Sequence, residues 1–321
     1  MSEHFLKEIQ INKFKGFTDF KVNNLKRVNL IGGRNNIGKT SFIEACYINV
    51  TSNQIEILAE ALWSIKYRRE NLNRLMDYQG GVKFNELEYL ESYRGYNTES
   101  NVLKSTFEIE KSEGKVIYRF SINEINTDVN KNEFSFSDVE HKNHNYIDSF
   151  GCSYFEIENY YTAIQAKDQE KKLNNILNQF DDRIQSFKIM NSIPKCSVNN
   201  EWIELNELGD GARHLIAIIS AIFSSENGYL FIDEIDNGIH YTFLDEIWRQ
   251  IFKISKTLNC QVFATTHSRE CIEAFNRANE ADDGVYLEFY RNEKTKKIQV
   301  KHRGYQQLDY SLNSNGEFRG E

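Results

Sequence analysis

Apolar and polar residues alternate with period two at the start of the chain and then recur at helical spacing. FLKEIQI and FKGFTDFKV alternate, and RVNLI is a short apolar run that ends in glycines. We therefore expect three strands followed by a turn. Beyond the turn, TSFIEACYINV and IEILAEALWSIKY carry apolar residues at helical spacing, for example Ile55, Leu58, Leu62 and Ile65. Helices are expected to follow the glycine turn.

The middle of the chain predicts a hairpin and then a polar loop. VLKSTFEIE and KVIYRFSI alternate on either side of the polar turn KSEGK, which is typical of an antiparallel hairpin. Residues 123–148 are rich in Asn, Asp, Ser and His, so we expect a loop there that holds the solvated pair His141 and His144. A charged helix is expected at about 167–180, and Pro194 is expected in a connection before a short strand around WIEL.

The last third of the chain alternates apolar strands with helices. GARHLIAIISAIF predicts a helix, GYLFID a strand, YTFLDEIWRQIFKISKTL a helix and CQVFATTHS a strand. GVYLEFY and KKIQV then predict a hairpin. Because strands and helices alternate, the expected fold class is α/β with a largely parallel sheet. No heptad pattern persists, so no long coiled-coil arm is expected.

Composition narrows the class of protein. With 321 residues, 40% hydrophobic residues and a net charge of -8, the chain can bury a core, and its surface is not uniformly attractive to nucleic acid or anionic lipid. The five cysteines are widely spread and form no C-x-x-C pair. No apolar run is long enough to cross a membrane. We therefore expect a cytoplasmic protein without a membrane partner.

The glycine-rich turn carries the strongest chemical motif. GRNNIGKT fits the P-loop (Walker A) pattern G-x-x-x-x-G-K-[ST] and lies between an expected strand and an expected helix. Such a loop turns its backbone N–H groups toward phosphate at a helix N-terminus. Lys39 is expected to neutralise the outer phosphates of ATP, Thr40 to bind Mg²⁺ and Ser41 to bond a phosphate oxygen. The expected nucleotide-binding residues are Gly33, Arg34, Asn35, Asn36, Ile37, Gly38, Lys39, Thr40 and Ser41.

Two acidic residues end the apolar strand YLFIDE, as in a Walker B motif. Buried strands seldom end in two carboxylates unless these hold a cation. Asp233 is therefore expected to bind Mg²⁺ and Glu234 to activate the attacking water. The strand CQVFATTHS ends at the sheet edge where parallel sheets bind ligands, so His267 is expected to reach the γ-phosphate.

A second glycine-rich segment, LGDGARH, opens the helix that precedes the strand YLFIDE. Gly209, Asp210 and Gly211 offer backbone N–H groups at a helix start. By itself the segment is better explained by a loop that ends in an N-cap aspartate. Its function depends on the motifs around it.

The order of these motifs resembles the ABC-type ATPase head, and more narrowly the SMC-like ATPases of the OLD (overcoming lysogenisation defect) group. IQINKFKGF, GGRNNIGKTSFIEA and FIDEIDNGIHY carry the resemblance, which is weakest over residues 50–165. It implies an AAA-family ATPase head with a mainly parallel core sheet, an N-terminal antiparallel β lobe and a helical insertion. It also implies one head divided at 1–50, 51–165 and 166–321, with His267 as the switch histidine.

The resemblance implies that the site is completed by a second subunit. Residues 208–213 would be the signature motif, which contacts the γ-phosphate held by the P-loop of the opposite subunit, and Asn237 to His240 would form the D-loop at the dimer seam. Because the usual signature serine is Gly209 here, this contact would depend on backbone N–H groups and Arg213. Gln165 is a candidate for the Q-loop glutamine.

Three other activities fit the sequence less well. The OLD nucleases carry a C-terminal TOPRIM domain with an Asp-x-Asp pair, which this chain does not contain. A nuclease is therefore expected only as a separate effector protein. The guanine-binding pattern N-K-x-D is absent, since the two Asn-Lys pairs begin NKFK at Asn12 and NKNE at Asn130. The helical insertion of a transporter subunit is not recognisable.

Two functions remain as alternatives. The first is Mg²⁺-dependent ATP hydrolysis that drives formation of a homodimer or higher oligomer, in DNA maintenance or anti-phage defence beside a separate effector. The second is a nucleotide-gated clamp or sensor that binds DNA or protein and hydrolyses little ATP. Glu234 favours the first, whereas Gly209 leaves the second open. A DNA partner is expected to bind the basic N-terminal strands and the cluster Lys66, Arg68 and Arg69.

Overall fold

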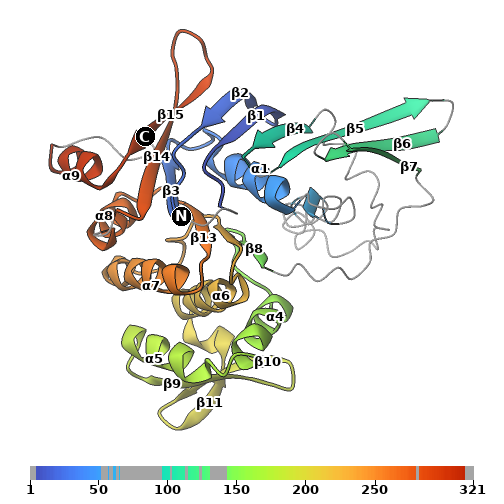
Figure 1. Cartoon of the computed structure of the whole chain (residues 1–321). Helices are drawn as coiled ribbons and strands as arrows, with labels where there is room; N and C mark the ends of the chain where they lie inside the picture. Colours follow the sequence, from blue (N-terminus) through green and yellow to red (C-terminus); the bar gives the residue numbers. More distant parts are fainter. Residues whose placement is uncertain are drawn as a thin grey trace, which may run out of the picture.

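The computed structural model describes most of the chain. The described residues are 5–51, 57, 61–62, 65, 96–101, 103–112, 115–122, 125–130, 143–279 and 282–314. They form two six-stranded sheets and one three-stranded sheet, with helices packed around the central one. Figure 1 shows the β14–β15 hairpin and the three-stranded sheet at opposite ends of the molecule.

The central sheet has the strand order β15-β14-β3-β13-β12-β8 and is parallel except at the edge strand β15. Its strands are β3 Val28–Gly33, β8 His144–Ile147, β12 Tyr229–Ile232, β13 Gln261–Thr265, β14 Gly284–Arg291 and β15 Ile298–Arg303. Leu230 and Ile232 belong to the core on one face, whereas Tyr229 and Phe231 belong to the core on the other. β12 is apolar throughout, as expected for a strand whose two faces are both covered.

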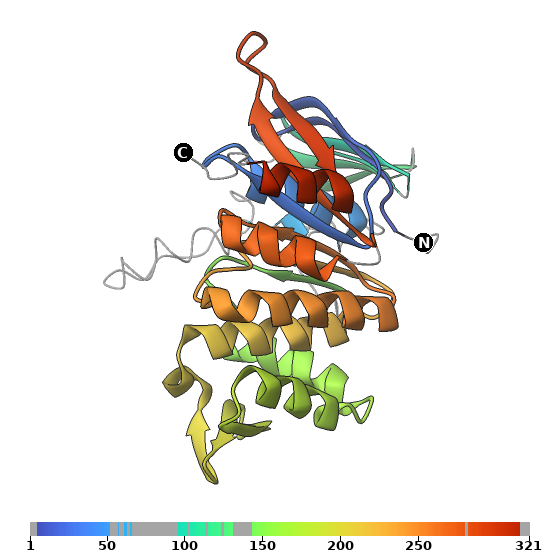
Figure 2. The ribbon, with the colours of Figure 1, turned by 90° about the vertical axis from the view of Figure 1, so that its left-hand side faces the viewer.

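Helices cover one face of this sheet, and a single helix with the N-terminal lobe covers the other. The helices are α1 Lys39–Thr51, α6 Asp210–Ser224, α7 Leu244–Thr257, α8 Arg269–Ala278 and α9 Tyr305–Asn313. Figure 2 shows α8, α7 and α6 stacked beside one another, and Trp248 and Phe275 lie in the core that they share with the sheet. Phe42 and Tyr47 of α1 pack into the opposite core.

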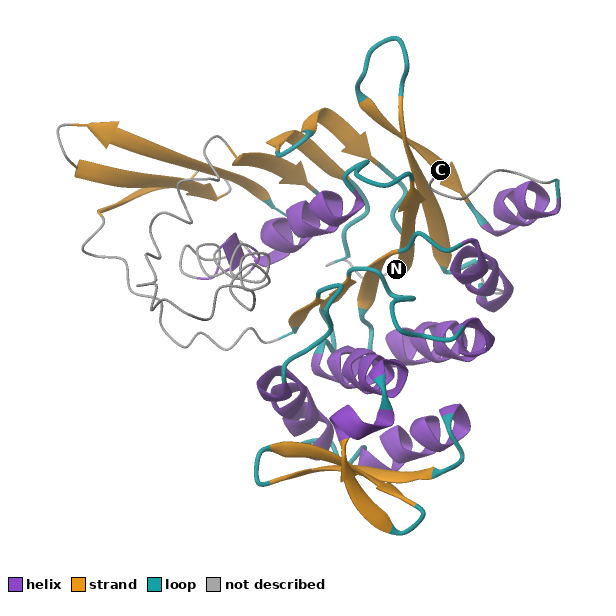
Figure 3. Ribbon diagram, turned by 180° about the vertical axis from the view of Figure 1, so that it is seen from behind, coloured by secondary structure: helices purple, strands orange, loops and turns teal. Residues whose placement is uncertain are grey.

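The second six-stranded sheet forms the N-terminal lobe and has the order β2-β1-β4-β5-β6-β7. Its strands are antiparallel: β1 Ile9–Phe14, β2 Phe17–Val22, β4 Tyr96–Ser100, β5 Lys104–Ser112, β6 Lys115–Ile122 and β7 Ile125–Asn130. Figure 3 shows β5 and β6 extending away from the body. The expected N-terminal strands and the expected hairpin across KSEGK are therefore confirmed.

The three-stranded sheet and the helices around it lie on the side of α6 that faces away from the central sheet (Figure 1). The sheet comprises β9 Ile184–Met190, β10 Ile193–Val198 and β11 Glu201–Glu204, and the nearby helices are α4 Tyr154–Gln165, α5 Glu170–Phe180 and the short 3₁₀ helices η1 Leu205–Leu208 and η2 Tyr241–Phe243. α4 packs on α6 and α5 packs on β9. The charged helix expected at 167–180 corresponds to α5.

The prediction of a loop at 123–148 is wrong at both ends of this range. β7 begins at Ile125, and β8 runs from His144 to Ile147. His144 therefore lies in a strand, and its ring stacks on Tyr229 at 5.5 Å, while His141 falls outside the described residues. A strand of four residues is too short to show a period, so its pairing with β12 decides its conformation.

Pro194 lies in β10 and not in a connection. It is opposite Ile189 of β9, but the pairing of β10 with β11 starts only at Lys195. Proline is tolerated here because no third strand needs its missing N–H. α4 was also not expected, although Ser153 and Glu156 form a capping box at its start. Of the second helical segment, Ile55 and Leu58 lie outside the described residues.

Candidate nucleotide site

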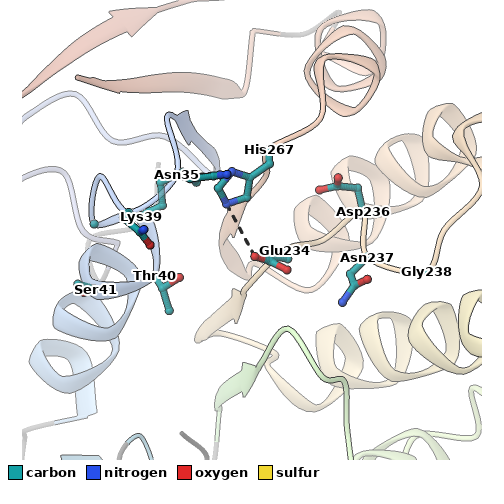
Figure 4. A pocket seen from close by; sticks show the side chains of 11 residues that line it. Asn35, Lys39, Thr40, Ser41, Glu234, Asp236, Asn237, Gly238 and His267 are labelled. Atoms are coloured by element: carbon teal, nitrogen blue, oxygen red, sulfur yellow. Dashed lines mark hydrogen bonds and ion pairs between the residues drawn. The ribbon is translucent and has the colours of Figure 1, made fainter. Parts of the chain in front are cut away.

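A cavity of about 850 Å³ opens beside the carboxyl ends of β3, β12 and β13. It is lined by Asn35, Asn36, Gly38, Lys39, Thr40, Ser41, Glu234, Asp236, Asn237, Gly238 and His267. Figure 4 shows the P-loop side chains on one side, Asn237 and Gly238 on the other, and Glu234 and His267 between them. The structure thus brings most of the expected P-loop residues, Glu234 and His267 around one space.

The P-loop connects β3 to α1 along a path that glycine permits. Gly33 has a φ of +136°, and a Cβ on this residue would lie 2.3 Å from the carbonyl oxygen of Phe289. Ile37 is buried in the core below the loop. The loop wraps around Lys39, whose Nζ donates to the carbonyl oxygens of Gly33 at 2.9 Å and Arg34 at 3.1 Å. Arg34 and Ile37 therefore act through the backbone and the core and not through the cavity lining.

Lys39 is a buried cation without a directly bonded carboxylate among the described residues. Its side chain is 4% exposed, and its Nζ donates to Nδ1 of His267 at 3.1 Å. Burial lowers the pKa of Lys39 to about 8, although Asp233, Glu234 and Asp236 act in the opposite direction. A buried ammonium held by carbonyls and an imidazole is well suited to receive an anion such as a phosphate.

Thr40 and Asp233 follow different strands of the central sheet and meet at its edge. Thr40 Oγ1 donates to Asp233 Oδ1 at 2.9 Å, and Thr265 Oγ1 donates to the same oxygen at 2.6 Å. A hydroxyl and a buried carboxylate in contact are the oxygen ligands that Mg²⁺ binds beside nucleotide phosphates. The residues expected to hold Mg²⁺ therefore fit that ion.

Glu234 is held in an uncommon backbone conformation. Its φ is +51°, and its N–H donates to Thr265 Oγ1 at 2.8 Å. Burial raises the pKa of Glu234, and the nearby Asp233 and Asp236 raise it further. Left-handed backbone at a residue other than glycine persists when its surroundings impose it, which is frequent at functional sites.

His267 lies between Lys39 and Glu234. Its Nε2 is 3.7 Å from Glu234 Oε1, which is too long for a hydrogen bond. Burial and the Lys39 charge lower the pKa of His267, so the imidazole is neutral at neutral pH. A neutral ring that accepts from Lys39 can still donate from its other nitrogen to an oxygen in the cavity.

The turn after Glu234 contributes residues that the sequence did not predict as ligands. Asp236 lines the cavity and accepts a hydrogen bond from Thr266 Oγ1 at 2.6 Å. Asn237 Nδ2 donates to the carbonyl oxygen of Ser149 at 2.6 Å. Asp236 is the third acid of the segment DEID, and this was the available signal for it. The direction of its side chain, however, depends on the turn and not on the alternation of a strand.

The expected signature residues lie next to the cavity and outside its lining. A Cβ on Gly211 would be 2.9 Å from the carbonyl oxygen of Gly238, which is on the cavity rim. Gly209 and Asp210 are exposed at the start of α6. Arg213 Nη2 donates to Phe150 O at 3.3 Å. The first turn of α6 is thus tied to the rim of the site while its N-terminal end faces outward.

Gln165 does not line the cavity. It is exposed at the last position of α4, where its carbonyl oxygen accepts from the N–H of Asp168 at 3.0 Å. The prediction of Gln165 as a Q-loop candidate finds no support in this geometry.

The fold and the site define a P-loop ATPase head. The description "AAA ATPase domain" matches residues 50–272, which include the expected signature residues, Asp233, Glu234 and His267. Because this match covers more than half of the chain, the chain belongs to the AAA ATPase domain family. It is an ATPase whose α/β fold has the mainly parallel core sheet and antiparallel lobe that we expected.

Two comparisons with known proteins agree with this assignment. An "ATP/GTP phosphatase" of Helicobacter pylori (strain ATCC 700392 / 26695) is 23% identical over 333 residues, which cover 87% of this chain and 89% of the relative. The solved structure of an SMC head bound to the C-winged helix domain of ScpA superimposes with a TM-score of 0.54 at 9% identity, covering 94% of this chain and 99% of that chain. The second likeness concerns the fold alone. Within the described residues, no helix is both long and apolar enough to span a membrane.

Proposed function

We propose that the chain hydrolyses ATP in this cavity and that the turnover operates a molecular switch. The observation that carries the proposal is the convergence of Lys39, Thr40, Glu234 and His267 around one cavity, with the buried Asp233 bonded to Thr40 behind it. These residues come from three segments of the chain. Mg²⁺, when bound, neutralises the phosphate charge that develops during transfer. The protein residues position the nucleotide and the attacking water.

Each side chain has a role that its surroundings support. Lys39 turns from its carbonyl partners to the β- and γ-phosphates, and Thr40 with Asp233 holds Mg²⁺. Ser41 bonds a phosphate oxygen. Glu234 accepts the proton of the attacking water, because its raised pKa makes it a stronger base than an exposed carboxylate. His267 donates a hydrogen bond to the γ-phosphate.

The site is completed by a second copy of the chain. Gly209, Asp210 and Gly211 present a helix N-terminus, which favours anions, but they do not line the cavity of their own chain. Asn237 lies at the rim, between the cavity and the N-terminus of α6. In a homodimer, the α6 N-terminus of one subunit would meet the γ-phosphate held by the other.

The switch acts on a partner, in DNA maintenance or anti-phage defence beside a separately encoded effector. We also propose that the chain is one head of the OLD type. Its parts would be residues 1–50, 51–165 and 166–321. The alternative is a nucleotide-gated clamp or sensor with little hydrolysis, which Gly209 leaves open because it removes one hydroxyl donor. Glu234 favours hydrolysis, because a carboxylate 3.7 Å from His267 in the cavity can accept the proton of the attacking water.

The test begins with variants of single residues. Lys39→Ala should abolish binding of a fluorescent ATP analogue, whereas Lys171→Ala, on the exposed side of α5, should bind as wild type does. Glu234→Gln should bind ATP, lose turnover and accumulate as a dimer or larger oligomer in light scattering. Equal affinity of wild type and Lys39→Ala would refute the site, and an ATP-insensitive Glu234→Gln monomer would refute ATP-driven assembly.

A mixing experiment tests the composite site. Asp210→Arg blocks the signature face without entering the core, since the Asp210 side chain is 83% exposed. A substitution at Gly211 would instead collide with Gly238 of the same chain. Mixing Lys39→Ala with Asp210→Arg should restore part of the ATPase activity, because one of the two sites is then intact. Glu201→Arg, on the distant three-stranded sheet, is the control that should stay active alone. No recovery in the mixture would indicate catalysis within one chain.

A further inference from the structure

The β14–β15 hairpin is strongly basic in a chain that is acidic overall. Residues 284–303, which include β14 and β15, contain six Lys or Arg residues and two Glu residues, and Glu288 pairs with Arg303 at 2.6 Å. The whole chain, in contrast, has a net charge of -8. Figures 1 and 2 show that the tip of this hairpin projects beyond the body of the molecule. A concentrated positive charge on a projecting element attracts polyanions despite the overall charge.

Several of these charges are available to a ligand. Lys294 and Lys296 are exposed at the tip and form no ion pair within the described residues. Within the part of the chain that the structure describes, Arg291 Nη1 donates only to the backbone oxygen of Lys296, at 3.1 Å. Lys297 lies 3.5 Å from Asp19, and both side chains are more than half exposed, so this pair contributes little and is easily exchanged.

A groove of about 600 Å³ lies between the end of β15 and α9. It is lined by Lys301, His302, Arg303, Gln306, Gln307, Tyr310 and Ser311. Tyr310 is 75% exposed, and Lys301 Nζ lies 4.9 Å from the centre of the Tyr290 ring. The exposed ring of Tyr310 among cations and amides suits nucleic-acid bases and phosphates, whereas an acidic peptide needs the cations alone.

The basic N-terminal strands are less available for such binding. Lys15 is paired with Glu44, Lys21 with Glu8 at 3.2 Å and Lys26 with Asp282 at 2.8 Å. Arg27 lies over the Phe5 ring and donates to the backbone of Ser255. The other predicted cluster, Lys66, Arg68 and Arg69, lies outside the described residues. Lys7 and Lys13 are exposed there and form no ion pair with the described residues, so among these residues the hairpin has the more concentrated unpaired charge, in Arg291, Lys294 and Lys296.

The base of the hairpin rests on the P-loop. The carbonyl oxygen of Phe289 lies 2.3 Å from the place of a Cβ on Gly33, and Ile298 Cδ1 lies 3.6 Å from the place of a Cβ on Gly38. The Phe289 ring also packs on Phe42 of α1 at 5.1 Å between ring centres. A ligand that shifts the hairpin would therefore move the backbone of the phosphate-binding loop.

From these contacts we infer that the hairpin and its groove bind a nucleic-acid strand and that this binding changes the rate of ATP turnover. The strand's phosphates contact Arg291, Lys294 and Lys296, and a base stacks on Tyr310. The signal passes through Phe289 and the P-loop. The inference names the partner of the proposed switch and rests on that proposal for its effect on turnover.

The binding test compares two pairs of charge reversals. Fluorescence anisotropy with a labelled single-stranded oligonucleotide is measured over a range of salt without ATP. Lys294→Glu/Lys296→Glu should weaken binding at least tenfold and flatten the slope of log affinity against log salt by about 1 to 2, because each lost phosphate contact removes roughly 0.7. Lys171→Glu/Lys253→Glu, exposed on α5 and α7, applies the same charge change elsewhere and should bind as wild type does.

Equal binding by the two double variants would overturn the inference. Displacement of the oligonucleotide by polyglutamate as readily as by unlabelled oligonucleotide would also overturn it, in favour of an acidic protein. Tyr310→Ala should weaken binding with an unchanged salt slope, and an unchanged affinity would argue against stacking. All three variants change exposed positions, and their melting temperatures should match the wild type.

The effect on turnover separates this inference from the proposed function. Oligonucleotide should change the ATPase rate of wild type and of Lys171→Glu/Lys253→Glu, and should leave that of Lys294→Glu/Lys296→Glu unchanged at its basal value. If wild type hydrolyses ATP but neither binds nor responds to oligonucleotide, the inference fails and the proposed hydrolysis stands. If wild type binds oligonucleotide without turning over ATP, the proposed function fails while the surface remains.

Discussion

His214 is buried beneath the turn that carries Glu234, and its titration provides a quantitative test of the fold around the site. The side chain is 6% exposed on α6, and its Nε2 has no hydrogen-bond partner in the described part of the chain. Burial lowers the pKa of His214 to about 4, an effect that the backbone of Ile235 opposes and the Arg213 charge reinforces. The folded protein therefore resists protonation of this ring.

The sign and size of the effect follow from the two pKa values. In the unfolded chain the group titrates near 6.5, whereas in the folded chain it titrates near 4. Between these values the unfolded state holds more protons, so the free energy of unfolding falls as the pH is lowered through the window. The whole shift corresponds to about 3 kcal/mol, at roughly 1.4 kcal/mol per pKa unit, of which about 2 kcal/mol is lost by pH 5.

Urea denaturation followed by circular dichroism measures this loss. The free energy of unfolding is determined near pH 7.5 and near pH 5 for wild type, for His214→Gln and for the exposed control His240→Gln. Removing the titrating ring should make the loss between the two pH values about 2 kcal/mol smaller in His214→Gln than in wild type. His240→Gln should retain the wild-type loss. A His214→Gln protein that loses stability as steeply as wild type would refute the buried, neutral state of His214.

Three further predictions concern catalysis. Thr40→Ala and Asp233→Asn should each lower kcat at saturating ATP by at least tenfold and raise the Mg²⁺ concentration needed, whereas Thr40→Ser should keep most of the activity; an unchanged Mg²⁺ titration would contradict this role. Gly211→Ala should lower both melting temperature and ATPase rate, since its Cβ would lie 2.9 Å from a carbonyl oxygen, while Gly16→Ala, with no atom within 4 Å of its Cβ, should not. Because the pKa of Glu234 is raised above 4.5, kcat should fall as the pH drops through that raised value, and a flat acid limb would count against Glu234 as the base.

The sequence alone determined the parts of the site that are local. The P-loop at 33–40 needs a strand, a glycine turn and a helix in direct succession, and all three are visible in consecutive residues. Asp233 and Glu234 follow an apolar strand in the same way. The helix and strand types of the last third were also predictable, because each element is long enough to show its period.

Short or exceptional elements depended on their neighbours. β8 has four residues and carries His144 and Asn145, so no alternation marks it as a strand. Pro194 lies in a strand because the adjacent edge is not paired there. In both places the local preference is weak, and the pairing with another strand determines the conformation.

Only the tertiary structure decided which segments meet. Thr40 and Asp233 are 193 residues apart and Lys39 and His267 are 228 apart, yet both pairs are in contact. They meet because β3 lies beside β13 and β13 beside β12, which places all three carboxyl ends at one edge. The buried strands are similar apolar runs, so their composition does not specify which of them pair. Their order in the sheet follows from the packing of helices and lobe on both faces at once, which no single segment contains.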